Sequence, residues 1–370
     1  MTNSFKKTYL TLFSILLSFQ LLAGWPEYRG GQHLPGVTTS TIPTSINLSW
    51  TFETGDEIKS TPVVQGNRIV VGSTDNQLYC LDLEGKLVWQ FEASNAIEAP
   101  ALIRNNTVYV GDLTGMFYAL DLETGRKIWE YEAMNQISAA ANWWSDGQRE
   151  YILVGAYDYY LHAIDARTGK AVWQYEAMNY LHAAVAVTGN YAVFGGCDGL
   201  LHVVDIRTGR VATTTEVASY VAGAALLDGT RAYIGDYDGK FSCIDFTTGE
   251  FCWSFERASR PLPFIGSPAL SGNRIIVGNR DRFVYAMDKN TGEVLWQRNT
   301  GSQVEASPLS DGRNVLVANM RGDLMLLNEQ NGNIIRTFEL GSPLQGSPAV
   351  VGNLIVIGAQ DGVIYGLEGN

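Results

Sequence analysis

The chain has 370 residues, of which 46% are hydrophobic and 17% charged, and its formal net charge is −12. This composition is typical of a folded protein and excludes a disordered or coiled-coil chain. The acidic balance argues against nucleic acid or an anionic membrane surface as a partner. Because a single hydrophobic core stops growing near roughly 250–300 residues, we expect a chain of this length to have a repeat architecture or several domains.

Residues 1–24 have the pattern of a secretory signal peptide. Two lysines precede an apolar run over 9–22, and the small residues Ala23 and Gly24 follow it. The run is short for a membrane span, although an uncleaved signal anchor stays open as an alternative. Trp25 stands where a bacterial lipoprotein carries its lipidated cysteine, so we expect no lipid anchor. The sequence therefore predicts a periplasmic or secreted protein.

A repeat of about 40 residues fills the chain from residue 45, after a short N-terminal extension over 25–44. Its clearest mark is a glycine, followed four positions later by tryptophan in five of seven copies. The glycines are Gly85, Gly125, Gly169, Gly209, Gly249, Gly292 and Gly332, at spacings between 40 and 44 residues.

Each repeat is expected to form four short strands. In the sixth repeat we predict strands over 266–270, 273–278, 283–287 and 293–296, separated by turn residues such as Gly272. Four strands in every 40 or so residues are typical of a propeller blade.

The two ends of the chain are expected to complete an eighth blade. Seven full copies are followed by three predicted strands, over 346–350, 353–358 and 362–365, and a fourth is missing. The segment 47–53 near the N-terminus supplies it. We therefore predict an all-β fold, an eight-bladed β-propeller of four-stranded antiparallel blades over 45–370. Sharing one blade between the two terminal strands removes an open sheet edge.

The aspartate, glycine and tryptophan of the repeat are expected to have structural roles. A carboxylate at the end of a third strand can accept turn N–H groups, glycine supplies positive φ, and the indole packs between blades. Six aspartates spread round a ring cannot converge on one metal ion. They are Asp82, Asp121, Asp165, Asp205, Asp245 and Asp288.

Two histidines and four cysteines are also assigned to the interior. His162 and His202 fall at a position that is mostly tyrosine, so we expect hydrogen-bonded core residues there and not ligands. Cys243 and Cys252 flank one predicted hairpin, and a disulfide between them stays open. The alternative is that all four cysteines are small buried hydrophobes.

A third histidine, His182, begins an inner strand at the predicted axis. Repeat alignment matches it with Lys59, Ile97, Ser138, Ala222, Ile265, Glu305 and Gln345. The next position is nearly always small, with Ser60, Glu98, Ala139, Ala183, Gly223, Gly266, Ala306 and Gly346, as expected where eight strands crowd an axis. We expect a ring of polar residues at one mouth of the channel, lining either a water-filled passage or a binding site. They are Lys59, Glu98, His182, Glu305 and Gln345.

One face of the ring carries a second candidate site. In a propeller the loops between blades share a face with those joining second to third strands, and the repeat hairpins lie on the other. Exposed tyrosine and methionine are typical of adaptable recognition surfaces, although tyrosines also pack against neighbouring loops. The candidate partner-binding residues, in blades two to five, are Met134, Asn135, Tyr157, Tyr159, Met178, Asn179, Tyr180, Tyr220 and Tyr237.

The repeat resembles a known family. Tyr-Ala-x-Asp-x-x-Thr-Gly-x-x-x-Trp, at 118–129 and 285–296, resembles the pyrroloquinoline-quinone-like (PQQ-like) propeller repeat, and the resemblance covers nearly all of 45–370. The stretch Trp25-Pro-Glu-Tyr-Arg-Gly30 resembles the start of many exported bacterial proteins of this superfamily. The superfamily implies either a quinoprotein dehydrogenase or a non-catalytic propeller, of which the BamB-type factor for outer-membrane assembly is the best known.

The dehydrogenase branch implies a quinone stacked between an indole and two adjacent disulfide-bonded cysteines, with Ca²⁺ held by Glu, Asn or Asp. No two cysteines are adjacent in this sequence and the predicted loops are short. We therefore assign no catalytic, cofactor or metal residue and expect neither PQQ nor Ca²⁺. The predicted function is a monomeric, non-catalytic scaffold that binds a protein partner in the cell envelope, by analogy in outer-membrane protein assembly. A PQQ- and Ca²⁺-dependent oxidoreductase is the alternative.

Overall fold

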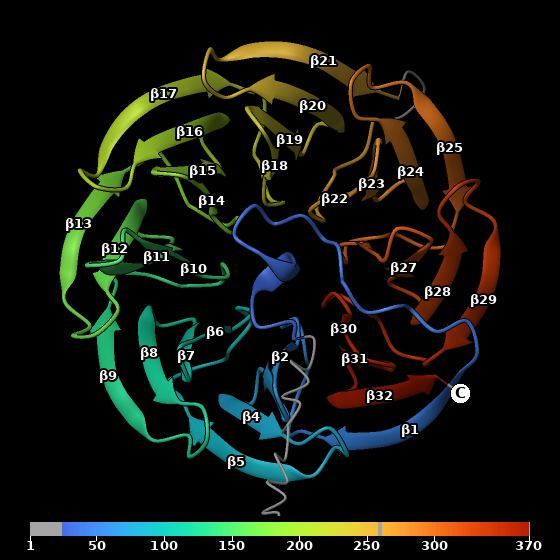
Figure 1. Ribbon diagram of the computed structural model, residues 1–370, viewed down its shortest axis with the longest axis horizontal. Helices are drawn as coiled ribbons and strands as arrows, with labels where there is room; N and C mark the ends of the chain where they lie inside the picture. Colours follow the sequence, from blue (N-terminus) through green and yellow to red (C-terminus); the bar gives the residue numbers. More distant parts are fainter. Residues whose placement is uncertain (1–23, 258–260, 370) are drawn as a thin grey trace, which may run out of the picture.

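Eight four-stranded antiparallel sheets form a ring around a central axis (Figure 1). The structure, a computed structural model, describes residues 24–257 and 261–369. The predicted signal peptide lies outside these residues except for its last position, Gly24. The predicted all-β, eight-bladed propeller is confirmed.

The strands of each blade follow one another from the axis outward. Blade 1 contains β2 (Val63–Gln65), β3 (Arg68–Gly72), β4 (Gln77–Leu81) and β5 (Leu87–Glu92). Blade 2 contains β6 (Leu102–Arg104), β7 (Thr107–Gly111), β8 (Met116–Asp121) and β9 (Lys127–Glu132). Blade 3 contains β10 (Asn142–Ser145), β11 (Glu150–Gly155), β12 (Tyr160–Asp165) and β13 (Ala171–Glu176). Blade 4 contains β14 (Ala186–Thr188), β15 (Tyr191–Gly195), β16 (Leu200–Asp205) and β17 (Arg210–Glu216).

The other half of the ring repeats this plan. Blade 5 contains β18 (Leu226–Asp228), β19 (Arg231–Gly235), β20 (Lys240–Asp245) and β21 (Glu250–Glu256). Blade 6 contains β22 (Ala269–Ser271), β23 (Arg274–Gly278), β24 (Phe283–Asp288) and β25 (Val294–Asn299). Blade 7 contains β26 (Leu309–Ser310), β27 (Asn314–Ala318), β28 (Asp323–Asn328) and β29 (Ile334–Glu339). Blade 8 contains β30 (Ala349–Val351), β31 (Leu354–Gly358), β32 (Val363–Gly369) and, as its outer strand, β1 (Ile46–Glu53).

The ring is closed by the pairing of β1 with β32. The two strands are antiparallel, with Thr51 opposite Tyr365 and Phe52 opposite Ile364. Gly366 leaves room for the Trp50 ring, since a Cβ there would lie 2.1 Å from an indole carbon. The predicted sharing of one blade by both ends of the chain is therefore confirmed.

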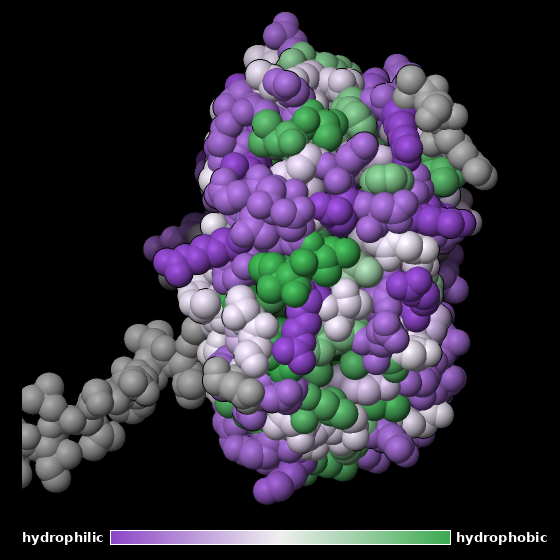
Figure 2. All heavy atoms as spheres, turned by 90° about the vertical axis from the view of Figure 1, so that its right-hand side faces the viewer, coloured by the Kyte–Doolittle hydropathy of each residue, from purple (hydrophilic) through white to green (hydrophobic). Residues whose placement is uncertain are grey.

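The burial of the strands follows their place in the blade. Second and third strands such as β7 and β8 are buried at most positions because both of their faces pack against neighbouring blades. Outer strands such as β9 alternate between exposed and half-buried side chains. Figure 2 views the outer side near β25 and β29, where apolar side chains appear as separate patches between polar ones. The outer edge thus carries no continuous apolar surface on this side.

Six of the eight outer strands carry a tryptophan that is a wedge between two blades, as predicted. Trp89 Nε1 donates a hydrogen bond to the Leu122 carbonyl of the next blade at 2.8 Å. The hairpin glycine of that blade, Gly125, has φ 68° and lies on the indole, so that a Cβ would come within 2.7 Å of the ring. The same indole-to-carbonyl bond is made by Trp50, Trp129, Trp173, Trp253 and Trp296.

The repeated aspartates cap the hairpins. Asp121 Oδ1 accepts hydrogen bonds from the backbone N–H of Thr124 at 2.9 Å and from its hydroxyl at 2.7 Å. Asp165 makes the same two bonds with Thr168. These carboxylates are structural and lie in separate blades, as the sequence predicts.

The two interior histidines are hydrogen-bonded at both ring nitrogens. His162 lies between the Tyr131 hydroxyl and the Asp158 carboxylate, and its side chain is fully buried. His202 has Tyr175 and Asp198 in the same places. The predicted role as core residues is confirmed.

All four cysteines are free thiols. Cys243 pairs with Trp253 across the hairpin, and Cys252 falls at the bulge that follows, where its exposed thiol lies within hydrogen-bonding reach of the Cys243 thiol. The disulfide considered for this pair is not formed. The alternative of four buried thiols is also wrong, since Cys252 is exposed and Cys197 half-buried.

The N-terminal extension crosses the ring and closes one end of the channel. Its 3-10 helix η1 (Tyr28–Gly30) lies on the axis, as the blue segment in Figure 1 shows. Backbone hydrogen bonds join the extension to six blades, at Val64, Ile103, Val187, Leu227, Leu270 and Ser310. Side-chain bonds from Gln32 and Ser40 reach the other two, at Trp143 and Gly352.

Candidate functional site

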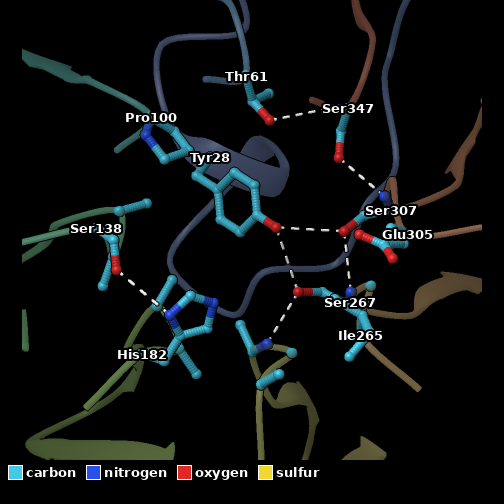
Figure 3. Close-up of a pocket in the computed structure, with 18 of the residues that line it drawn as sticks. Tyr28, Thr61, Pro100, Ser138, His182, Ile265, Ser267, Glu305, Ser307 and Ser347 are labelled. Atoms are coloured by element: carbon cyan, nitrogen blue, oxygen red, sulfur yellow. Dashed lines mark hydrogen bonds between the residues drawn. The ribbon is translucent and has the colours of Figure 1, made fainter. Parts of the chain in front are cut away.

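A cavity lies on the axis of the ring. It is closed at the end where the N-terminal extension crosses and lined there by Tyr28. The five residues predicted to ring a channel mouth all line it: Lys59, Glu98, His182, Glu305 and Gln345. We call this space the axial cavity; Figure 3 shows Tyr28 in its middle, surrounded by residues of several blades.

The repeat alignment behind this ring was wrong by one residue in blade 2. Gly72 packs on Ile97 as Gly358 packs on Ile58, so Ile97 is the buried residue that precedes the ring. Glu98 therefore occupies the position of Lys59 and His182, and not the small-residue position. The contact between an inner-strand glycine and the residue before the ring determines this register, and it joins residues that are not neighbours in the sequence.

Two ion pairs lie in the wall of the cavity. Lys59 Nζ is 2.9 Å from Glu98 Oε1, and this hydrogen bond raises the pKa of the lysine. Arg280 Nε is 2.8 Å from Glu305 Oε1. The sequence did not single out Arg280, although it occupies the same loop position in blade 6 as Tyr157 in blade 3 and Tyr237 in blade 5. Both carboxylates are thus already matched by a cation.

His182 is held in one orientation by its neighbours. The Tyr157 hydroxyl lies 2.6 Å from Nδ1 and the Ser138 hydroxyl 3.3 Å from it. Burial lowers the pKa of His182, so the imidazole is neutral at pH 7. If Nδ1 accepts the tyrosine proton, Nε2 carries the ring hydrogen and is a donor; if Nδ1 donates to the tyrosine oxygen, Nε2 is an acceptor.

The floor of the cavity is a group of hydroxyls. The Tyr28 hydroxyl lies 3.3 Å from Ser267 Oγ and 3.2 Å from Ser307 Oγ, as Figure 3 shows. Each serine hydroxyl also accepts a hydrogen bond from a backbone N–H of the preceding blade. The Ala224 N–H donates to Ser267 Oγ, and the Ser267 N–H donates to Ser307 Oγ, both at 2.9 Å. No sequence pattern indicates that Tyr28 reaches this point, because the extension lies outside the repeat.

The candidate partner-binding residues lie at the open end of the cavity, on the face of the interblade loops. Met134 is 91% exposed, Met178 82% and Tyr220 55%. Tyr159, Tyr180 and Tyr237 are exposed as well. We call the nine predicted residues the tyrosine–methionine face.

The residues of this face differ in exposure and in structural role. Tyr157 is half-buried and stacks on Tyr180 with 4.8 Å between ring centroids. The amides of Asn135 and Asn179 hold the loops together through bonds to the carbonyls of Tyr157 and Cys197. The two asparagines therefore stabilise the loops that carry the tyrosines.

The two predicted sites form one surface. A hollow of about 440 Å³ at the mouth of the axial cavity is lined by five residues of the tyrosine–methionine face, namely Tyr157, Asn179, Tyr180, Tyr220 and Tyr237. Its other walls include His182, Glu305, Gln345 and Arg280. Met134, Asn135, Tyr159 and Met178 lie outside this lining, and we call Met134, Tyr159 and Met178 the rim.

The residues present do not match the quinone and calcium site of a quinoprotein dehydrogenase. That site needs a disulfide between adjacent cysteines and an indole, whereas the cysteines here are free and no tryptophan lines the cavity or its mouth. Within residues 24–257 and 261–369, no group of three or more His, Cys, Asp or Glu side chains is placed to hold a metal ion. We derive no catalytic step for this site.

The fold and the closed axial cavity define an eight-bladed PQQ-like β-propeller of the quinoprotein superfamily. The chain belongs to the family described as outer membrane protein assembly factor BamB, whose profile matches residues 43–179, 157–307 and 280–370. No curated protein sequence matches it significantly.

Solved structures with the same fold include proteins of different function. BamB from Moraxella catarrhalis has a TM-score of 0.73 at 21% identity, covering 87% of this chain and 97% of that one. The computationally designed protein Ika8 has a TM-score of 0.75 at 19% identity, covering 85% and 97%. A europium-containing methanol dehydrogenase has a TM-score of 0.77 at 14% identity, covering 94% and 98%. At these identities the likeness shows the fold alone.

No helix among the described residues is long and apolar enough to cross a membrane.

Proposed function

We propose that this protein is a non-catalytic scaffold of the cell envelope that binds a protein partner through the tyrosine–methionine face. The observation that carries the proposal is the exposure of large flexible and aromatic side chains on adjacent loops, with Met134 and Met178 more than four-fifths exposed. Tyrosine and methionine are enriched in protein interfaces and poorly suited to bare solvent. A surface that keeps them exposed is best explained by a partner that covers them.

The family supports a role in outer-membrane protein assembly, which is how it is described. We infer that the partner belongs to the outer-membrane assembly apparatus. The signal-like segment over residues 1–24 favours an exported protein that meets this partner in the periplasm.

The rim residues allow a test that leaves the axial cavity intact. Replacing Met134, Tyr159 and Met178 by serine is expected to weaken partner capture more than tenfold, because exposed anchors of this size are interface hot spots worth about 2 kcal/mol or more each. The free energy of unfolding should change little, since the methionines are largely exposed and Tyr159 is an exposed residue whose ring packs beside Tyr180. The measurement is quantitative recovery of envelope proteins on the tagged protein, compared between the variant and the original chain.

Tyr191→Ser is the matched control. Tyr191 is also an exposed tyrosine, but it begins β15 beside the hairpin on the opposite face. It should leave capture unchanged. Equal recovery of the same partner by the rim variant and the original protein would show that this face is not the interface.

A further inference from the structure

We propose that the axial cavity and its mouth bind a neutral saccharide of one or two rings. The inference goes beyond the scaffold function and does not depend on it. Five residues of the tyrosine–methionine face also line the mouth, and the rim residues, which lie outside the lining, separate the two tests. Its basis is the combination of balanced charge, free hydrogen-bonding groups and tyrosine walls in one closed space. The mouth alone, at about 440 Å³, is within the size of small-molecule sites, roughly 300–1,000 Å³.

The charges in the lining cancel in pairs. The charged residues that line the cavity and its mouth are Lys59, Glu98, Arg280 and Glu305, two cations and two carboxylates. They form the ion pairs Lys59–Glu98 and Arg280–Glu305 at 2.9 and 2.8 Å. A charged ligand would have to break one of these pairs or face an equal number of like charges. A neutral ligand meets no such cost.

Hydrogen-bonding capacity remains after these pairs are formed. Glu305 uses Oε1 for Arg280, and Gln345 uses Oε1 for the Gln360 amide, which leaves Glu305 Oε2 and Gln345 Nε2 without a partner among the described residues. His182 likewise engages only Nδ1, so its Nε2 is available. An acceptor, a donor and an imidazole nitrogen that takes either role according to the tautomer therefore line one small space.

Hydroxyl groups are the ligand chemistry that matches this set. A hydroxyl both donates and accepts, so neighbouring hydroxyls of one sugar ring can satisfy a carboxylate oxygen, an amide N–H and an imidazole nitrogen of either tautomer together. A wholly apolar ligand would displace water from these groups and leave them unpaired. Sites built around hydroxyl contacts also discriminate strongly against analogues that lack them.

The tyrosines supply the other half of a saccharide site. Tyr157, Tyr180, Tyr220 and Tyr237 line the mouth, and Tyr157 and Tyr180 form a stacked pair. Tyrosine combines a large apolar ring face with a polar edge, which suits a molecule with C–H faces and hydroxyl edges. Tyr28 lines the opposite end of the cavity, where the N-terminal extension crosses, so the tyrosines lie at the open end.

The test uses the full-length protein and a panel of sugars in saturation-transfer NMR and calorimetric titration. The neutral probes are glucose, N-acetylglucosamine, maltose, cellobiose and N,N′-diacetylchitobiose, and the charged probes are glucosamine and glucuronate. We expect at least one neutral probe to bind, and each charged probe to bind more than tenfold more weakly than the best neutral one. No transfer to any neutral probe, or equal binding of the charged ones, would overturn the proposal.

Substitutions in the lining test whether the sugar binds at the mouth of the axial cavity. Tyr180→Ala and Glu305→Gln should each weaken binding more than tenfold, whereas Tyr180→Phe, which keeps the ring face, should stay within threefold. The rim variant Met178→Ala should bind sugar as the original protein does, whatever it does to partner capture. If neither Tyr180→Ala nor Glu305→Gln changes the affinity for the sugar, the sugar binds elsewhere and the assignment is wrong. Should Glu305→Gln fail to fold, the two Tyr180 variants carry the test.

Discussion

Replacing Trp296 by alanine is expected to lower the free energy of unfolding by about 3–5 kcal/mol, the usual cost of truncating a buried tryptophan. Its ring is only 8% exposed and lies between blades 6 and 7. The truncation removes the hydrogen bond from Nε1 to the Glu329 carbonyl, which is 2.8 Å long. It also leaves a cavity beneath Gly332, whose backbone was shaped around the indole. Chemical denaturation followed by circular dichroism measures the change.

Arg336→Ala is the matched control for this experiment. Arg336 occupies the same repeat position in blade 7, where no tryptophan is present, and its side chain is exposed. A surface change of this kind should alter stability by no more than about 0.5 kcal/mol. If Trp296→Ala cost no more than Arg336→Ala, the account of tryptophan as the wedge between blades would be wrong.

Removal of residues 1–44 is expected to abolish a cooperative unfolding transition. The extension buries Trp25, Leu34 and Ile42, and large apolar side chains of this kind contribute about 2–5 kcal/mol each. It also buries Arg29, whose guanidinium donates to the Pro268 carbonyl at 2.7 Å. The sum is comparable with the whole stability of a typical protein, about 5–15 kcal/mol. Thermal melting of the purified chain provides the measurement.

The control for this deletion is a chain that begins at Gly24. It keeps every contact between the extension and the blades, so it should retain the cooperative transition that the shorter chain loses. A chain beginning at residue 45 that melts at the same temperature would contradict the role given to the extension.

The fold could be predicted from the sequence because the same short hairpin motif recurs in most of the blades. In one such hairpin Asp121 caps the turn, Gly125 has positive φ and Trp129 packs against the next blade. The number of such hairpins, at a spacing of about 40 residues, gives the number of blades. The missing strand at the C-terminus and the spare one at 47–53 then determined the closure. All of these signals are local or periodic, which is what a sequence pattern can carry.

The site was predicted only in part because its contacts are not periodic. The tyrosines and the polar ring were found as departures from the repeat, but no pattern showed that they share one cavity. Tyr28 comes from an extension with no repeat partner, and its contacts with Ser267 and Ser307 span more than 200 residues. Arg280 could have been found, since it stands at the loop position of Tyr157 and Tyr237.

The most direct measurement of the central claim is photo-crosslinking from the tyrosine–methionine face in the cell envelope. A photoreactive phenylalanine analogue replaces Met178 in one chain and Tyr191, on the opposite face, in another. The account predicts a discrete cross-linked product with an outer-membrane assembly protein from position 178 and none from position 191. Cross-links from position 191 alone, or an absence of any product from position 178, would contradict it.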